Sequence, residues 1–131
     1  MTVDIGRIYD NKDNTDAIRI LVDRVWPRGI SKRTANLDYW LKDIAPSTEL
    51  RQWFQHDPKL YGAFKEKYEK ELRDNETQKE AFEKLKAIVN QHHHVLLLYS
   101  AKDTKHNQAV VLQQLLNTYI YMFIVDHYTC R

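Results

Sequence analysis

Two apolar runs dominate the hydrophobic pattern of the chain, and both end abruptly in charged and polar residues. They are AIRILVDRVW at residues 17–26 and HVLLLYS at residues 94–100. Continuous apolar runs rich in β-branched residues are typical of strands that a parallel sheet buries on both faces. A segment at residues 2–9 has three apolar positions among polar ones, which suits a partly buried strand. The pattern therefore predicts a largely parallel sheet with the strand at 17–26 near its centre.

Between these runs the apolar residues recur every three or four positions, which is the period of an amphipathic helix. Ser47 and Asp57 stand where N-cap residues are expected, and Pro58 suits the first turn of a helix. The dense Glu and Lys residues of 59–86 are typical of a solvated helix face. Helices are therefore predicted at residues 36–45, 48–54, 58–74, 76–88 and 106–117.

The segment YIYMFIVDHY at residues 119–128 is ambiguous, because periodicity alone does not assign a short apolar run to a helix or a strand. Its β-branched and aromatic content favours a final strand. Together these elements predict an α/β fold: a small, mostly parallel sheet covered by helices in a three-layer-like sandwich. The length of 131 residues predicts one domain over 1–131, with the structure of the tail at 118–131 left open.

Composition narrows the function classes. The 20 Lys and Arg residues nearly balance the 18 Asp and Glu residues, so a net charge of +2 provides no broad basic field for nonspecific nucleic-acid binding. Cys130 is the single cysteine, which excludes an internal disulfide and favours a reducing compartment. The N-terminal residues lack a signal-peptide pattern, and the apolar runs are shorter than the roughly 18 residues of a membrane span. We therefore expect a soluble, cytoplasmic protein without a membrane segment.

Polar residues capable of binding an anion follow the first apolar run. Asp23, Arg24, Trp26 and Arg28 lie within six positions around a proline. Arginine holds carboxylate or phosphate through paired hydrogen bonds, an aspartate can orient it, and tryptophan can supply a flat apolar wall. The alternative is structural: Asp23 and one arginine pair with each other or with the backbone, and Trp26 packs in the core.

A second polar cluster follows the strand at 94–100. It consists of Ser100, Lys102, Asp103, His106 and Asn107, at the start of a predicted helix. A helix N-terminus carries unpaired N–H groups and a partial positive charge, so a lysine beside it favours an anionic ligand. The alternative is that Asp103 or the following threonine simply caps the helix.

If the two strands are neighbours, the two clusters converge, because ligands of open α/β sheets collect beyond the carboxyl ends of the strands. His106 and Asp23 are then the candidates for proton transfer. His56 lies beside the predicted cap Asp57 and could turn towards the same site, although a structural role explains this pair equally well. Ser100 lacks the GxSxG setting of an exposed nucleophile, so covalent hydrolysis is not expected.

Metal and nucleotide-cofactor chemistry receive little support. The adjacent side chains of residues 92–94, three histidines, point in divergent directions and do not ligate one ion in regular structure. The three glycines have neither the dinucleotide-binding nor the P-loop spacing. We therefore expect no metal and no cofactor.

Three stretches resemble the YeaO-like branch of the domain-of-unknown-function family 488, a group of small bacterial proteins. They are RILVDRVWPRG at 19–29, LDYWLKDIAPSTELRQWFQHDP at 37–58 and LLLYSAKDTKHNQAVVL at 96–112. The resemblance implies an intracellular α/β domain. It also implies the joint importance of Asp23, Arg24, Trp26, Pro27, Arg28, His56, Asp57, Lys102, Asp103, His106 and Asn107. It implies no particular substrate. The end of the chain, TYIYMFIVDHYTCR, departs from the family pattern.

The first functional hypothesis is a protein that binds a small phosphate or carboxylate ligand at the strand ends, either as a binding protein or as an enzyme. Arg24, Arg28 and Lys102 would neutralise the ligand's charge. The alternative is a nucleic-acid or protein-binding module without catalysis. A further hypothesis treats the tail as an edge strand that recruits a second copy into a homodimer.

Overall fold

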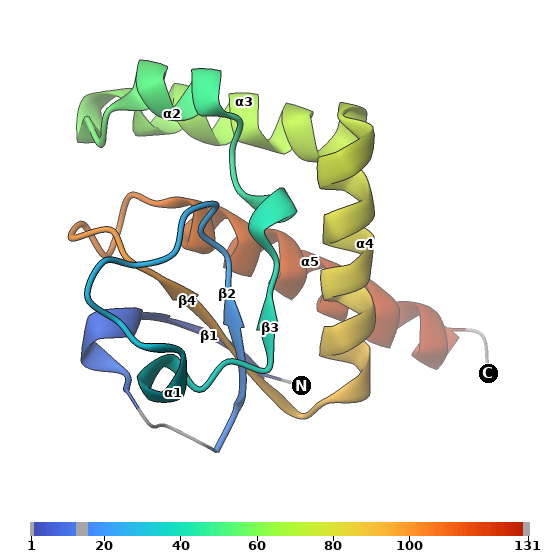
Figure 1. Ribbon diagram of the computed structural model, residues 1–131. Helices are drawn as coiled ribbons and strands as arrows, with labels where there is room; N and C mark the ends of the chain where they lie inside the picture. Colours follow the sequence, from blue (N-terminus) through green and yellow to red (C-terminus); the bar gives the residue numbers. More distant parts are fainter. Residues whose placement is uncertain (1, 13–15, 130–131) are drawn as a thin grey trace.

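The computed structural model describes residues 2–12 and 16–129 and contains one four-stranded sheet (Figure 1). All of the paired strands run parallel, in the order β1-β4-β2-β3. This arrangement confirms the predicted small α/β fold with a mostly parallel sheet. The strands are β1 (Thr2–Arg7), β2 (Ile18–Leu21), β3 (Tyr39–Trp40) and β4 (His94–Tyr99).

Helices of very different length connect and follow the strands (Figure 1). Between β4 and the described end of the chain runs a single long helix. The α-helices are α1 (Lys32–Ala35), α2 (Thr48–Phe54), α3 (Tyr61–Asp74), α4 (Glu76–Gln91) and α5 (Gln108–Thr129). Short 3-10 helices are η1 (Ile8–Asp10), η2 (Lys42–Ile44) and η3 (Pro58–Leu60).

The strands β2 and β4 are neighbours at the centre of the sheet, as the convergence of the two polar clusters requires. Ile20 pairs with Leu97, and Leu21 pairs with Leu98. Side chains of a strand alternate between the two faces of a sheet, and both faces are covered here. A large core under α2, α3, α4 and α5 contains Ile20 and Leu97, whereas a smaller core on the other face contains Leu21 and Leu98.

The predicted caps and the break at 74–75 are confirmed. Ser47 Oγ accepts a hydrogen bond from the backbone N–H of Leu50 and begins α2. The side chain of Asp57 accepts from Lys59 N–H and begins η3, which leads directly into α3. The side chain of Asn75 accepts from Gln78 N–H, so α4 starts as a separate helix.

The predicted helix at residues 36–45 is wrong, because sheet pairing overrides the helical spacing. Asn36 ends α1 in the left-handed conformation, with φ of 47°. Asp38 N–H then donates to the Arg19 carbonyl, and Leu41 N–H donates to the Leu21 carbonyl. These bonds extend the sheet by β3, and η2 takes up the remaining residues before Pro46. Of the apolar positions that suggested a helix, Leu41 and Ile44 are buried, whereas Leu37 is half-buried and Trp40 is exposed.

The predicted final strand at residues 119–128 is also wrong, since these residues continue α5. The segment from Gln108 onward contains no glycine or proline that would end the helix. Each further residue adds a hydrogen bond to a helix that is already nucleated, so β-branched side chains do not stop it. The hypothesis of a homodimer formed through an edge strand in the tail is therefore not supported, because these residues form a helix.

The helix α5 has the length and mean hydropathy of a membrane span over Gln108–Asp126, at a hydropathy of 1.2. Its inner face, however, belongs to the large core: Val111, Leu112 and Leu116 are fully buried. The side chain of Gln113 also donates to the carbonyl of Val3 on β1. The first half of α5 is therefore apolar because it packs as a core helix.

Candidate functional site

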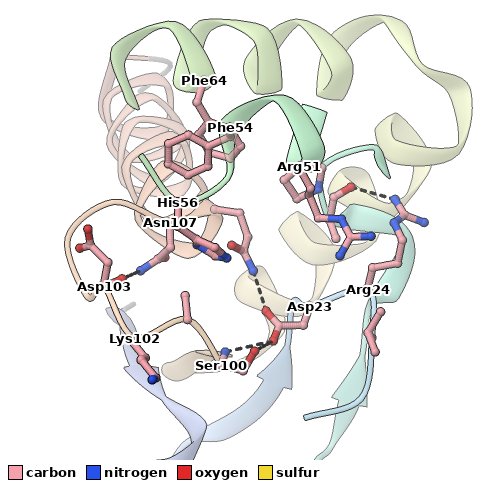
Figure 2. Close-up of a pocket in the computed structure, with 15 residues that line it drawn as sticks. Asp23, Arg24, Arg51, Phe54, His56, Phe64, Ser100, Lys102, Asp103 and Asn107 are labelled. Atoms are coloured by element: carbon pink, nitrogen blue, oxygen red, sulfur yellow. Dashed lines mark hydrogen bonds between the residues drawn. The ribbon is translucent and has the colours of Figure 1, made fainter. Parts of the chain in front are cut away.

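A cavity of about 600 Å³ opens at the carboxyl ends of β2 and β4, where the sequence predicted a site. The segments that follow β2 and β4, the loop between η2 and α2, α2 with the turn after it, α3 and the start of α5 form its walls (Figure 2). The lining residues are Asp23, Arg24, Val25, Ala45, Pro46, Arg51, Phe54, His56, Phe64, Ser100, Ala101, Lys102, Asp103, Asn107 and Gln108.

Asp23 lies directly after β2 and forms the centre of a hydrogen-bond network. Its Oδ2 accepts from Ser100 N–H at 3.0 Å and from Ser100 Oγ at 2.6 Å. Its Oδ1 accepts from Gln108 Nε2 at 2.6 Å. Burial raises the pKa of the Asp23 carboxyl, although these hydrogen bonds and the charge of Arg51 favour the ionised form. The network fixes the ends of β2 and β4 and the first turn of α5 relative to one another.

Three cationic side chains surround the cavity. Figure 2 shows Arg24 and Arg51 on one side, with Lys102 across the cavity from them. Arg24 Nη2 donates to the Ala45 carbonyl at 3.0 Å, whereas its Nε is buried and has no hydrogen-bond partner among the described residues. Arg51 and Lys102 are exposed. A buried donor without a partner is costly, so the Arg24 Nε is a position where a ligand oxygen would be stabilised.

Aromatic and aliphatic residues line another part of the cavity. Phe54 and Phe64 stack with ring centroids 4.2 Å apart, and both are buried. Val25 is 62% exposed at the strand end, an unusual position for a large apolar side chain. His56 is exposed beside Phe54 and has a φ of 56°, in the left-handed region. The site therefore combines charge with apolar surface.

The turn after β4 is organised by Asp103. Its Oδ1 accepts from the backbone N–H groups of Lys105 and His106, and its Oδ2 lies 2.9 Å from His106 Nδ1. These contacts hold the pKa of the Asp103 carboxyl below its usual range. The backbone hydrogen bond from Lys105 makes the largest contribution to that lowering. The cap of α5 itself is neither Asp103 nor Thr104. Asn107 Oδ1 accepts from the N–H groups at positions 109 and 110, so the helix begins after Asn107.

The structure brings most of the sequence-predicted site residues together around one cavity. Seven of the ten contribute to its lining: Asp23, Arg24, His56, Ser100, Lys102, Asp103 and Asn107. Their neighbourhood follows directly from the pairing of β2 with β4. Whether they bind a ligand stays a prediction.

Trp26, Arg28 and His106 are not among the lining residues. Trp26 contacts the ring of Trp40 edge-on and donates to the Ile30 carbonyl, which is the structural alternative for this residue. Arg28 is exposed, and its carbonyl accepts from the Tyr9 hydroxyl. The ring of His106 bonds to Asp103 and contacts Tyr61 edge-on at 5.1 Å. Of the two expected proton-transfer residues, Asp23 lines the cavity and His106 does not, and their role in proton transfer stays a prediction.

Sequence reasoning missed Arg51 and Gln108, and it placed Phe54 only at the end of the predicted helix at 48–54. Arg51 lies on α2, and a basic residue on a short amphipathic helix gives no signal of its own. Gln108 follows the cap of α5, where its side chain reaches back to Asp23. A signal existed only for Phe54, because an aromatic residue near a helix C-terminus can face either a core or a cavity.

No group of three or more His, Cys, Asp or Glu side chains within residues 2–12 and 16–126 is arranged to hold a metal ion. In the histidine run, His94 Nε2 lies 2.7 Å from Asp4 Oδ2 on the neighbouring strand β1. This pairing places His94 in the sheet ladder. The polar side chains of the cavity are thus arginine, lysine, histidine, amide and hydroxyl groups around two carboxylates.

Comparison with known proteins identifies the family. A model described as "Inactive DUF488-N3 subclade" matches residues 2–122. The chain belongs to the DUF488 family. Within it, the chain is 43% identical over 112 residues to the "Uncharacterized protein YeaO" of Escherichia coli strain K12, covering 86% of this chain and 94% of the relative. It is 36% identical over 115 residues to the "Uncharacterized protein Rv3073c" of Mycobacterium tuberculosis strain H37Rv, covering 88% and 93%. No solved structure matches the DUF488 chain significantly.

The family assignment confirms the resemblance that the three sequence stretches indicated. These DUF488 relatives are bacterial proteins, as expected. Most of the cavity-lining residues lie within the quoted stretches, and all of them lie within the matched range. The matching family model describes its subclade as inactive.

Proposed function

We propose that this DUF488 protein binds a small molecule that carries a phosphate or carboxylate group beside an apolar portion, and that it does so without catalysis. The observation that carries the proposal is Arg24: its side chain lines the cavity beside Arg51, and its buried Nε has no hydrogen-bond partner among the described residues. An anionic oxygen placed there would accept a charge-assisted hydrogen bond, the strongest kind available to an arginine.

The charge of the site supports an anionic ligand. Arg24, Arg51 and Lys102 supply three positive charges, against the two carboxylates Asp23 and Asp103. Asp23 already accepts three hydrogen bonds, and Asp103 accepts from its own turn. Both carboxylates are therefore engaged, whereas Arg51 and Lys102 are exposed to solvent. The charge available to a ligand is positive.

The size and the apolar wall support a ligand larger than a free ion. The cavity volume of about 600 Å³ lies within the range of about 300–1,000 Å³ that is usual for small-molecule sites. Phe54, Pro46 and the exposed Val25 offer apolar contact beside the arginines. Such a site favours an organic phosphate or carboxylate over an inorganic anion.

Two observations favour binding over catalysis. His106, the expected proton-transfer residue, bonds to Asp103 and is not part of the cavity lining. The oxygens of Asp23 are held by Ser100 and Gln108, a role that orients the walls. The description of the matching subclade as inactive agrees with a protein that retains the fold and the cavity without the reaction.

Thermal unfolding in the presence of phenyl phosphate, benzoate and inorganic phosphate tests the proposal. A ligand that binds only the folded state raises the melting temperature with increasing concentration. We expect phenyl phosphate and benzoate to stabilise the wild type more than inorganic phosphate does. Arg51→Ala should abolish most of this effect, because the exposed Arg51 contributes charge to the cavity without holding other parts of the fold.

Arg28→Ala is the matched control, since it removes an equally exposed arginine outside the cavity. It should leave the ligand-dependent shift unchanged. Isothermal titration calorimetry with the same three probes provides an independent readout of affinity. The absence of any shift with all three probes, or an equal loss in Arg28→Ala and Arg51→Ala, would overturn the proposal.

A further inference from the structure

The outward face of α5 has an unusual composition. Its exposed residues recur at helical spacing and change from polar to apolar along the helix. Tyr121 is 67% exposed and Met122 is 55% exposed, far more than is usual for large apolar side chains. We call this surface the α5 stripe; it consists of Gln114, Asn117, Thr118, Tyr121 and Met122.

The α5 stripe carries no charge. No Asp, Glu, Lys or Arg occurs between Gln108 and Val125, although charged residues make up 29% of the chain. The helices α3 and α4, by contrast, cover their solvent faces with Glu and Lys. A helix face that is solvated by itself normally carries such charges. Depletion of charge with enrichment in tyrosine and methionine is instead the composition of a protein interface.

From this composition we infer that the α5 stripe is a contact surface between two copies of the chain. In a twofold-symmetric pair each copy contributes the same stripe, so a charged residue near the symmetry axis would lie against the same charge of the other copy. An uncharged stripe avoids that repulsion. The amide side chains of Gln114 and Asn117 each donate and accept hydrogen bonds, so each can pair with an identical group. The stripe is therefore complementary to itself.

The position of the stripe leaves it free for such a contact. Figure 1 shows that the C-terminal turns of α5 extend past α4 towards the edge of the molecule. Val111, Leu112 and Leu116 on the opposite face of α5 are buried in the core. Core packing therefore does not use the stripe. The family match ends at residue 122, but α5 continues to Thr129, with Ile124 44% exposed. The exposed Ile124 lies about one helical turn beyond Tyr121.

A membrane span is the competing explanation for the apolar character of α5. Spanning would require lipid around the whole helix, but the inner face lies against β1, β4 and α3. Gln113 and Gln108, whose side chains bond to β1 and to Asp23, would also lose these partners. A second copy needs only the exposed stripe and leaves the fold intact.

Sedimentation velocity of the full chain over a wide concentration range tests the inference. We expect the wild type to change from monomer to dimer as concentration rises. Tyr121→Glu should weaken self-association by at least about tenfold, because it places like charges at the buried contact. Trp53→Glu is the matched control: it changes an exposed aromatic residue on α2, outside the stripe, and should leave the dimer intact.

Gln114→Glu tests the charge argument with an almost isosteric change. Its dimer should be weaker than that of the wild type at low salt and should recover as salt screens the repulsion. Circular dichroism confirms in each case that the variant is folded, and a variant that is unfolded is replaced by Tyr121→Gln. A wild type that is monomeric at every concentration overturns the inference.

Binding to phospholipid vesicles distinguishes a second copy of the chain from a lipid surface as the partner of the stripe. The wild type is sedimented with vesicles of a zwitterionic lipid and with vesicles that also contain an anionic lipid. A dimer that stays in the supernatant supports the second copy. Monomers that sediment with the vesicles, and lose this property in Tyr121→Glu, would overturn the inference in favour of a lipid surface.

Discussion

Ser100 donates two hydrogen bonds to one oxygen of Asp23, although the two residues are 77 positions apart in the chain. The backbone N–H and the hydroxyl of Ser100 both reach Oδ2, at 3.0 and 2.6 Å. Asp23 follows β2 and Ser100 follows β4, so this contact holds the ends of two adjacent parallel strands together. It forms the floor of the cavity and determines where the neighbouring Arg24 and Lys102 can lie.

Removing the hydroxyl in Ser100→Ala should lower the free energy of unfolding by about 1.5–3 kcal/mol, the usual worth of a hydrogen bond to a charged group. The backbone bond remains, so the variant should fold. Urea unfolding followed by circular dichroism measures the change. Thr104→Ala, at an exposed position in the same loop, is the control and should change stability little. Equal effects of the two substitutions would contradict the role assigned to Ser100.

The Asp23 carboxyl should titrate above its ordinary pKa of 3.8, because burial outweighs its hydrogen bonds and the nearby charge of Arg51. A carboxyl whose pKa is raised by folding binds its proton more tightly in the folded state. Its contribution to stability is therefore fully present below pH 3.8 and is lost as the pH rises through the folded-state pKa. Carbon-detected NMR of the aspartate carboxyl groups measures this titration directly.

The Asp23→Asn variant isolates the same effect in stability measurements. The amide does not ionise in this range, so the difference in unfolding free energy, wild type minus variant, should fall as the pH rises through the folded-state pKa. Asp4→Asn, at an exposed carboxylate on β1, provides the comparison. A difference that increases with pH would mean that the hydrogen bonds from Ser100 and Gln108 outweigh burial.

The centre of the fold was accessible from sequence because its residues are determined by local composition. The run Val95–Tyr99 is buried throughout, and continuous β-branched and leucine residues are typical of such a strand. The caps Ser47 and Asp57 were also predictable, since each satisfies backbone N–H groups within three residues along the chain. These features depend on neighbours in sequence.

The errors occurred where partners distant in sequence decide the structure. Tyr39 and Trp40 pair with Ile20 and Leu21 in the sheet, and nothing within their own segment indicates this. The indole of Trp40 also donates to the Asp23 carbonyl, so an apparent helix residue is fixed at the end of β2. The final turns of α5 were misassigned because the β propensity of a short segment depends on whether a strand lies beside it.

The site shows the same division. Asp23 and Ser100 were predictable because both immediately follow recognisable strands and because parallel strands end at one edge of the sheet. Arg51 was not predictable, because its position depends on the direction in which α2 crosses that edge. Trp26 and Arg28 lie only a few residues beyond Asp23, but neither lines the cavity: the Trp26 indole donates to the Ile30 carbonyl, and Arg28 is exposed.

Asn107 should contribute more to the stability of α5 than the other polar residues of its loop. Its Oδ1 accepts from the first N–H groups of the helix, and its Nδ2 donates to the Asp103 carbonyl. Asn107→Ala should therefore lower the unfolding free energy by about 0.5–2 kcal/mol, as for other N-cap residues. Chemical denaturation measures the loss. Asn107→Ser keeps an uncharged oxygen acceptor and should restore part of it, and a serine variant as unstable as the alanine variant would contradict the capping role.

Gln55 and His56 at the end of α2 both have positive φ angles, of 47° and 56°. A side chain in the left-handed conformation costs roughly 1–2 kcal/mol, and glycine avoids this cost at the expense of a more flexible unfolded chain. We therefore expect each single glycine substitution to raise the unfolding free energy, by up to about 1 kcal/mol. Thermal and urea unfolding measure this gain.

The two variants should differ in ligand binding, because only His56 is among the residues that line the cavity. His56→Gly should reduce the stabilisation by phenyl phosphate, whereas Gln55→Gly should leave it unchanged. A stabilising substitution that weakens binding indicates that the strained backbone at His56 serves the site. His56→Ala keeps the β-carbon and should weaken binding without the gain in stability. If both glycine variants bound phenyl phosphate like the wild type, the left-handed turn would be only the end of a helix.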